Sequence, residues 1–317
     1  MLSGLKLLVT IDVEEEGLFT GQYSHGKAGV ENVLELSLLD PIFQSLNIRP
    51  TMLISYQVAR HKPHHDYLMK LNEKWKGEIG AHLHPWNTPP IQSLPYTHPI
   101  PSQLIPEGLL RSKLATLLEA LSVMGVEAQS FRMGRFSLGP KMFSILEQAG
   151  ILVDSSIVPT RKEYGGPEYL VAPVDPYFPD PQNLSSPGNS LVLEVPLTVL
   201  PIIPKLDLAL ECIVNTFPEF SATASWFSKH VGSLPAQPML VGINRLKTAV
   251  RLHRYRGGTT VTLYFHSSEL MPGACPQHPT KRHVEKFLQR IEKFLFWLCE
   301  EKGAISMTLS ECRKSCL

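Results

Sequence analysis

Short apolar segments that end in a polar side chain recur along this sequence, and helical segments separate them. Segments of this length, rich in β-branched residues, are typical of buried parallel strands. The predicted strands cover residues 6–11, 50–54, 78–82, 130–132, 151–154, 190–198, 261–265 and 304–309. Because strands alternate with helices, the sequence predicts an α/β fold with a parallel sheet, either open or closed into a barrel.

Helical periodicity is clearest in five segments, and two others lack a clear period. The predicted helices cover residues 31–46, 65–75, 107–123, 140–149 and 282–300. The stretch 159–187 is dense in Pro, Gly and Tyr and indicates an insertion at about 159–190, whereas 200–238 is left unassigned. A chain of 317 residues allows one large domain or two ordinary ones, and we expect a single domain over 1–317.

Polar side chains follow the predicted strands at their C-terminal ends. They are Asp12, Glu14, His82, His84, Arg132, Asp154 and His266. In a parallel βα barrel these ends share one face, on which such enzymes carry out their chemistry. The sequence therefore predicts one polar site at that face.

The pair His82 and His84 is the strongest metal-binding signal. Side chains two residues apart in a strand point the same way, so both imidazoles can face one ion. Two imidazoles, a carboxylate and an open position make a catalytic zinc-type site. The alternative is a pair of structural histidines packed beside Trp86. The acids Asp12 and Glu14 at another strand end favour the metal site.

Asp12 and Glu14 are also two residues apart. A metal-assisted hydrolase needs one carboxylate to hold the ion and another to accept a proton from water. Either residue can fill either role, and a solvated acidic loop is the alternative. We expect Glu15 and Glu16 to belong to such a solvated loop.

Three further residues have a chemical and a structural interpretation. Arg132 is predicted to position a carboxylate or the substrate, or else to form a surface salt bridge. Asp154 is a site residue, or else a turn or helix-cap residue. His266 stands where a general acid is wanted, because an imidazole can protonate a departing amine near neutral pH.

Charge, motifs and cysteines exclude other classes of protein. The formal net charge is +1, from 30 Lys and Arg against 29 Asp and Glu, so a nucleic-acid partner is not expected. There is no G-x-S-x-G, no P-loop and no G-x-G-x-x-G. The five cysteines form no C-x-x-C pair, and the N-terminal apolar run is too short to span a membrane. We expect a cytoplasmic protein without a transmembrane segment.

The order of these segments resembles the five motifs of the polysaccharide deacetylase family, also called the NodB-homology family or carbohydrate esterase family four. The matching segments are 10–14, 78–82, 131–132, 154–156 and 263–266, and 300–310 resembles the family's closing helix and strand. The resemblance implies a distorted (β/α) barrel of about seven strands. It also implies a divalent metal held by a carboxylate and two histidines, and hydrolytic deacetylation of an amino sugar.

The resemblance assigns a role to each matched residue. It makes Asp12 the catalytic base, His82 the first metal histidine and Arg132 the residue that orients the base. It makes Asp154 the acid of the fourth motif and His266 the catalytic histidine of the fifth.

The sequence departs from the family at three positions. Val13 stands where the family has a second aspartate, so either Glu14 supplies that acid or Asp12 serves alone. Trp86 stands four residues after His82, where the family has its second histidine, and His84 has to replace it. Gly134 occupies the position of the usual proline.

Two functions follow, with a third as a narrower alternative. The first is a metal-dependent deacetylase of a glycan or glycan precursor, with zinc as the expected ion and cobalt or nickel as alternatives. The second is a catalytically silent glycan-binding relative, and the third a metal-independent amidohydrolase of a small cyclic amide. Trp86 and the segment 85–106 are predicted to form one wall of a sugar cleft, and 164–178 part of the opposite rim. A Trp86 that merely plugs the barrel end is the alternative.

Overall fold

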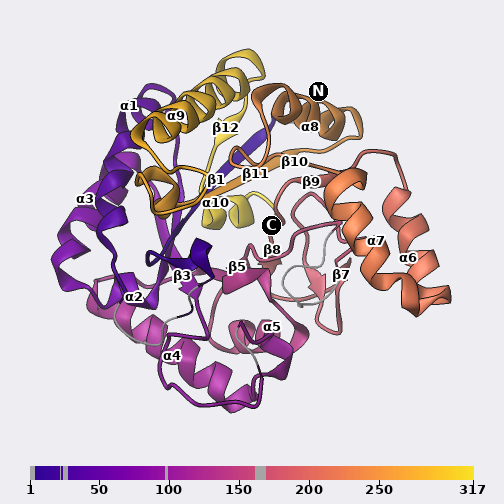
Figure 1. Ribbon diagram of the computed structural model, residues 1–317, viewed down its shortest axis with the longest axis horizontal. Helices are drawn as coiled ribbons and strands as arrows, with labels where there is room; N and C mark the ends of the chain where they lie inside the picture. Colours follow the sequence, from indigo (N-terminus) through magenta and orange to yellow (C-terminus); the bar gives the residue numbers. More distant parts are fainter. Residues whose placement is uncertain (1–3, 22, 24–27, 97–98, 161–168) are drawn as a thin grey trace.

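A curved sheet of parallel strands lies at the centre of the molecule and helices surround it (Figure 1). This computed structural model describes residues 4–21, 23, 28–96, 99–160 and 169–317. The strands of the sheet are Lys6–Val13 (β1), Thr51–Ser55 (β2), Glu78–Leu83 (β3), Ser130–Met133 (β4), Val153–Asp154 (β5), Leu193–Glu194 (β8), Thr260–His266 (β11) and Ile305–Ser306 (β12). Their order is β11-β1-β2-β3-β4-β5-β8, with β12 beside β1. All of these pairs are parallel. The fold is therefore the distorted (β/α) barrel that the sequence predicts.

Residues after β8 connect the two ends of this sheet. The backbone nitrogen of Thr198 donates to the carbonyl of Thr262 in β11 at 3.2 Å. The backbone nitrogen of Thr262 donates in turn to Oγ1 of Thr198 at 2.8 Å. One backbone and one side-chain hydrogen bond thus join the two edges of the sheet, which form no strand pair with each other.

Ten α-helices are present among the described residues. They are Asp40–Ser45 (α1), Tyr56–Ala59 (α2), His65–Trp75 (α3), Glu107–Val123 (α4), Pro140–Gln148 (α5), Leu206–Thr216 (α6), Ser221–Phe227 (α7), Ile243–Tyr255 (α8), Lys281–Phe296 (α9) and Leu309–Lys314 (α10). The 3-10 helices are Leu18–Thr20 (η1), Glu31–Leu39 (η2), Lys62–His64 (η3), Ser102–Leu104 (η4), Gly134–Phe136 (η5), Pro218–Phe220 (η6) and Ser267–Leu270 (η8). Two π-helical turns are Ser228–Gly232 (η7) and Trp297–Glu301 (η9). No helix among them is long and apolar enough to cross a bilayer.

Alternation along each strand separates an outer apolar face from the barrel interior. In β1 the odd positions, such as Val9 and Ile11, pack in the large core beneath the surrounding helices. Leu8 instead joins a small interior cluster with Leu309 and Cys312 of α10. Because side chains alternate with a period of two, Asp12 points to the same side as Leu8 and lies closer to the C-terminal end of β1. The interior is thus apolar at the N-terminal end of the strands and polar at the C-terminal end.

Most predicted elements are present, and several differ from the prediction. The segment 31–46 is η2 followed by α1, because Pro41 in the first turn of α1 favours a fresh helix start. The predicted strand 190–198 is reduced to Leu193–Glu194, and the last strand to Ile305–Ser306. Leu309 begins α10, whose apolar side closes the barrel interior. Helix α9 ends at Phe296, and η9 continues it as a π-turn.

The unassigned segment contains helical structure that the sequence pattern did not reveal. It begins and ends with an antiparallel pair, Val199–Pro201 (β9) and Ser233–Pro235 (β10). Helices α6 and α7 lie between these strands and stand at the right edge of Figure 1, outside the ring of helices. In the predicted insertion, Pro179–Asp180 (β6) and Asn183–Pro187 (β7) pair antiparallel. Residues 161–168 of that insertion, including Tyr164, lie outside the described residues.

Candidate metal centre

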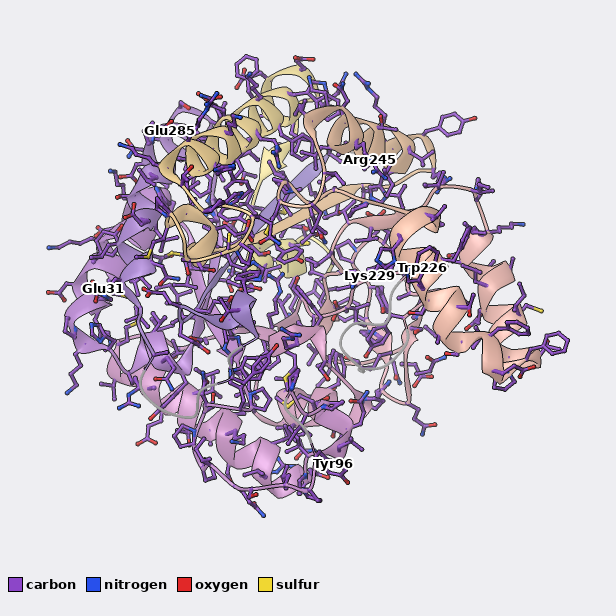
Figure 2. The ribbon with its side chains drawn as sticks, in the orientation of Figure 1. Glu31, Tyr96, Trp226, Lys229, Arg245 and Glu285 are labelled. Carbon is purple, nitrogen blue, oxygen red and sulfur yellow. The ribbon has the colours of Figure 1, made fainter. Side chains whose placement is uncertain are left out.

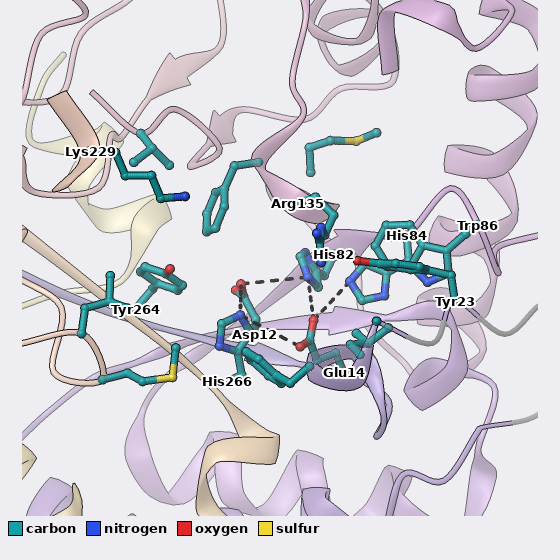
Figure 3. Close-up of a pocket in the computed structure, with 18 residues that line it drawn as sticks. Asp12, Glu14, Tyr23, His82, His84, Trp86, Arg135, Lys229, Tyr264 and His266 are labelled. Carbon is teal, nitrogen blue, oxygen red and sulfur yellow. Dashed lines mark hydrogen bonds and ion pairs between the residues drawn. The ribbon is translucent and has the colours of Figure 1, made fainter. Parts of the chain in front are cut away.

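A cavity of about 390 Å³ opens at the C-terminal ends of the strands (Figure 3). Five of the seven predicted strand-end residues line it, together with Trp86. The cavity is lined by Asp12, Glu14, His82, His84, Trp86 and His266, among others. Strand register explains this, because Asp12 lies beside His266 in β11 and His82 lies beside Arg132 in β4.

Glu14, His82 and His84 form a group with the geometry of a metal site. Oε2 of Glu14 lies 3.3 Å from Nε2 of His82 and 3.2 Å from Nε2 of His84. One ligand atom from each of the three residues lies within 4.8 Å of the others. All three side chains are buried. The carboxylate that meets the histidines is thus Glu14, and Asp12 lies further from His82, at 4.0 Å.

Each of these two imidazoles has its other nitrogen bound to a buried oxygen. Nδ1 of His82 lies 3.1 Å from the carbonyl of Arg132. Nδ1 of His84 lies 2.9 Å from Oε1 of Glu15. Because these acceptors take a proton from Nδ1, both rings direct Nε2 to the cavity side, where a bound cation would replace any proton on that nitrogen.

The expectation that Glu15 is solvated is wrong. Only 2% of its surface is exposed. Its carboxylate accepts hydrogen bonds from Ser55 at 3.0 Å and from Asn87 at 2.5 Å, besides its contact with His84. Glu16 is half-buried, and its Oε1 accepts from the backbone of Asn32.

Mutual pairing sets the charges of this group. Burial alone disfavours ionised Glu14, but His266, His82 and His84 outweigh burial and hold the pKa of Glu14 well below its usual range. Burial likewise disfavours protonated His84, yet Glu15 and Glu14 raise the pKa of His84 to about 10. The carboxylates therefore remain charged at neutral pH and favour a cation between them.

Asp12 is held by a buried arginine rather than by the histidines. Nη1 of Arg132 donates to Oδ1 of Asp12 at 2.6 Å. Arg132 has no exposed surface, which rules out the surface salt bridge as its role. Its remaining nitrogens donate to Thr10 Oγ1 and to the carbonyl and hydroxyl of Ser155. Oδ2 of Asp12 is left facing His266 Nε2 at 3.8 Å.

His266 has a buried carboxylate partner that the sequence analysis missed. Nδ1 of His266 lies 2.6 Å from Oε1 of Glu269, which also accepts from the His266 backbone at 3.1 Å. Burial disfavours the imidazolium, but Glu14, Glu269 and Asp12 together raise the pKa of His266 to about 9. Its Nε2 faces the cavity as a protonated group at neutral pH.

Asp154 does not line the cavity. Its carboxylate accepts from the backbone and hydroxyl of Ser156 at 3.0 and 2.7 Å. Glu194 lies beside it. Burial raises the pKa of Asp154 against the opposite effect of its hydrogen bond with Glu194, whereas burial and Asp154 together raise the pKa of Glu194. Asp154 thus shapes the end of β5, where Ser155 holds Arg132.

Trp86 and Gly134, two of the departures from the family pattern, both accommodate the ring of His84. The indole of Trp86 stacks on His84, with ring centroids 4.3 Å apart. A β-carbon at Gly134 would lie 2.6 Å from Cδ2 of His84 and 2.7 Å from the carbonyl of Leu83. No side chain fits at position 134 while His84 occupies its present place. Trp86 is only 4% exposed. It supports His84 through the stacking contact and also lines the cavity.

The rest of the rim differs from the predicted one. Apart from Trp86, no described residue of 85–106 lines the cavity, and neither does any described residue of 164–178. Tyr23 and Arg135 flank Trp86, while Lys229 and Tyr264 lie on the other side (Figure 3). Arg135 has a left-handed φ of 60°, a strained conformation that is common at functional sites.

Sequence signals existed for some of the missed residues. The spacing His-x-x-Glu, here His266 and Glu269, is that of a capping box, which the start of η8 forms. Lys229 comes from the unassigned segment, through η7, and gave no periodic signal.

Comparison with known proteins shows what this fold is similar to. No family model and no curated protein matches the sequence. A solved structure from Mycobacterium smegmatis, provisionally described as a polysaccharide deacetylase, is 17% identical with a TM-score of 0.58. The match covers 99% of this chain and 91% of that one. A second, from Parabacteroides distasonis and provisionally described as a glycoside hydrolase/deacetylase, is 12% identical with a TM-score of 0.64, over 98% of this chain and 70% of that one.

These likenesses establish the fold of the chain. It is the barrel fold of the polysaccharide deacetylase structures, with the cavity at the C-terminal ends of its strands.

Proposed function

We propose that the protein is a metal-dependent hydrolase that removes N-acetyl groups from an amino-sugar-containing glycan or glycan precursor. The observation that carries the proposal is the meeting of three metal-ligand side chains with two proton-transfer groups at one end of the barrel. The ligands are Glu14, His82 and His84, and the two other groups are Asp12 and His266.

The donor set fits a divalent cation. Two imidazoles with fixed Nδ1–H groups and one ionised carboxylate match the ligand preferences of zinc, with cobalt and nickel as alternatives. Three protein ligands facing an open cavity are the pattern of a catalytic rather than a structural site. A cation held there supplies Lewis-acid chemistry, since it polarises an acyl oxygen and makes water a stronger acid.

Asp12 is positioned to accept the proton of the attacking water. Arg132 binds Oδ1 and thereby fixes the carboxylate, so that Oδ2 faces the cavity side where His266 and His82 lie. A general base has to lie within hydrogen-bond reach of the proton it takes. The proposal thus makes Arg132 a positioning residue and Asp12 the base.

His266 is positioned to donate a proton to the departing amine. Glu269 holds Nδ1 and keeps the ring oriented, which leaves Nε2–H toward the cavity. When the acyl carbon–nitrogen bond breaks, the amine nitrogen receives this proton and acetate is released. The raised pKa of His266 keeps the donor protonated in the free protein.

The cavity walls favour a sugar. A volume of about 390 Å³ lies within the range of small-ligand sites. Phe19, Tyr23 and Trp86 supply apolar faces, while Arg135 and Lys229 supply hydrogen-bond donors. Sugar rings present C–H faces to aromatic groups and hydroxyls to polar ones.

The unpaired cysteines favour a reducing compartment. All five thiols are free, which suits the cytoplasm, where disulfides are rare. We propose that location, together with a glycan precursor as the substrate.

Two measurements on one preparation test the proposed function. Protein purified without chelator should contain a divalent metal in the cavity, by elemental analysis, and should release acetate from N-acetylglucosamine oligosaccharides or lipid-linked precursors. His82→Ala should lose both, whereas His283→Ala, on the exposed surface of α9, should lose neither.

Three outcomes would contradict this function. Cavity metal that stays absent after soaking with zinc, cobalt or nickel rules out metal dependence. Turnover of only small cyclic amides would indicate a metal-independent amidohydrolase. Glycan binding without turnover, lost in Trp86→Ala, would indicate a silent binding protein.

A further inference from the structure

A second group of two imidazoles and a carboxylate lies outside the cavity. It consists of Glu31 at the start of η2 and of His61 and His64 at η3. Glu31 lies at the outer edge of the molecule near α3, on the opposite side from Trp226 and Lys229 (Figure 2). The group therefore belongs neither to the cavity nor to the projecting helices α6 and α7.

The local fold brings the two histidines together. His61 precedes η3, and His64 is its last residue. In a 3-10 turn, residues three apart lie on the same side, one above the other. The ring centroids of His61 and His64 are accordingly 4.4 Å apart. Glu31 reaches them from a separate segment thirty residues earlier in the chain.

His64 is buried without a hydrogen-bond partner for its outer nitrogen. The residue is 6% exposed, and its Nε2 has no hydrogen-bond partner among the residues that the structure describes. A buried polar atom without a partner destabilises the fold, so such atoms are rare unless something else binds them. Oε1 of Glu31 lies 3.7 Å from this nitrogen.

That distance fits a shared cation better than a direct contact. A nitrogen and an oxygen 3.7 Å apart are too far for a hydrogen bond. Two ligands that are each about 2.1 Å from a tetrahedral zinc ion lie about 3.4 Å apart. One ligand atom from each of the three residues is within 4.8 Å of the others, so a small side-chain adjustment brings all three to one ion.

We propose that Glu31, His61 and His64 form a second site for a divalent cation of the zinc type, distinct from the cavity site. The ion would join η2 to η3 and complete the coordination that His64 lacks. Because Glu31 is largely exposed, a water molecule can take the fourth position.

The site has a structural consequence for the cavity. Asn32 follows Glu31 in η2, and its side-chain amide donates to the carbonyl of Glu14 at 3.0 Å and to Ser267 Oγ at 3.2 Å. An ion that fixes Glu31 therefore also restrains the residue that supports the end of β1.

Zinc titration by calorimetry, in chelator-free buffer, tests the second site. The wild type should bind two zinc ions per chain. Glu31→Gln combined with His61→Ala should bind one, and neither substitution disturbs a buried side chain. His65→Ala, a histidine of the same segment whose ring instead contacts the carbonyl of Ala59, is the matched control and should still bind two.

A variant without the cavity ligands separates the two sites. His82→Ala combined with His84→Ala should retain one zinc, and adding Glu31→Gln and His61→Ala should remove it. Glu31→Gln alone should weaken this remaining zinc by at least about tenfold, as expected for loss of a direct ligand. A zinc count of zero in the His82/His84 variant, or an equal loss of zinc in His65→Ala, would overturn the proposal. The count of one zinc in the His82/His84 variant depends neither on the cavity site nor on the acetate assay, so failure of the proposed function leaves it unaffected.

Discussion

The two histidine pairs of this chain lie beside carboxylates but are supported differently. In the cavity, His82 and His84 each have one nitrogen bound to a buried acceptor, which aims the other nitrogen at Glu14. At the second group, the outer nitrogen of His64 has no hydrogen-bond partner among the described residues. The protein orients the first pair, whereas the proposed cation would complete the second. Burial of histidines alone therefore does not distinguish a preorganised site from an incomplete one.

The largest expected effect separates proton transfer from metal binding in the cavity. His266→Ala should lower the rate of acetate release by about a hundred- to ten-thousand-fold, the usual cost of losing a general acid. The proposed ligands Glu14, His82 and His84 remain, so the metal content should not change. Steady-state kinetics together with elemental analysis check this. Full activity with metal still bound would show that His266 is not the donor.

A second substitution removes the support of His84, so that the cavity pair resembles His61 and His64. Glu15→Ala removes the acceptor of His84 Nδ1 and should weaken metal binding about ten- to hundredfold, as loss of such outer partners does elsewhere. Glu15→Gln retains an acceptor oxygen and should recover part of the affinity. Competition with a metal indicator measures both, with circular dichroism as the control for folding. Unchanged affinity in Glu15→Ala would mean that the fold orients His84 without it.

The smallest effect concerns buried acids that have no histidine beside them. The raised pKa of Glu194, caused by burial and by Asp154, means that the folded protein holds a proton that the unfolded chain releases. The contribution of protonated Glu194 to the free energy of unfolding is therefore fully present below the unfolded pKa of about 4.5. It is lost as the pH rises toward the pKa of the folded state. Glu194→Gln should remove that loss, by at most about 1.4 kcal/mol per pH unit. Urea unfolding at pH 5, 6, 7 and 8 measures the difference, and a gap that does not grow with pH contradicts it.

The strand ends were predictable because their signal is local. An apolar run followed by Asp12, or by the alternating His82 and His84, needs only the period of a strand to place these side chains in the barrel. The fold followed from the same runs and the helices between them. Arg132 and His266 were placed correctly at the strand ends for the same reason.

The residues that the sequence did not place depend on distant contacts. Glu15 is buried because Ser55 and Asn87, forty and seventy-two positions later, surround its carboxylate. Asp154 is kept from the cavity by Ser156 and by Glu194, which arrives from another strand. The partners that come from other strands leave no local signal, so Glu15 was misjudged, whereas the hydrogen bonds from Ser156 agree with the turn alternative for Asp154.

Gly134 ties the second imidazole of the cavity to a backbone position fifty residues away. With His84 in place, even a methyl group at position 134 would come within 2.6 Å of the ring. The two changes have an order along a mutational path, because the glycine has to come first and the histidine afterwards. Epistasis of this kind means that a library that varies the metal site one residue at a time will find few functional variants. Positions 84, 86 and 134 have to be randomised together for the site to acquire a different ligand arrangement.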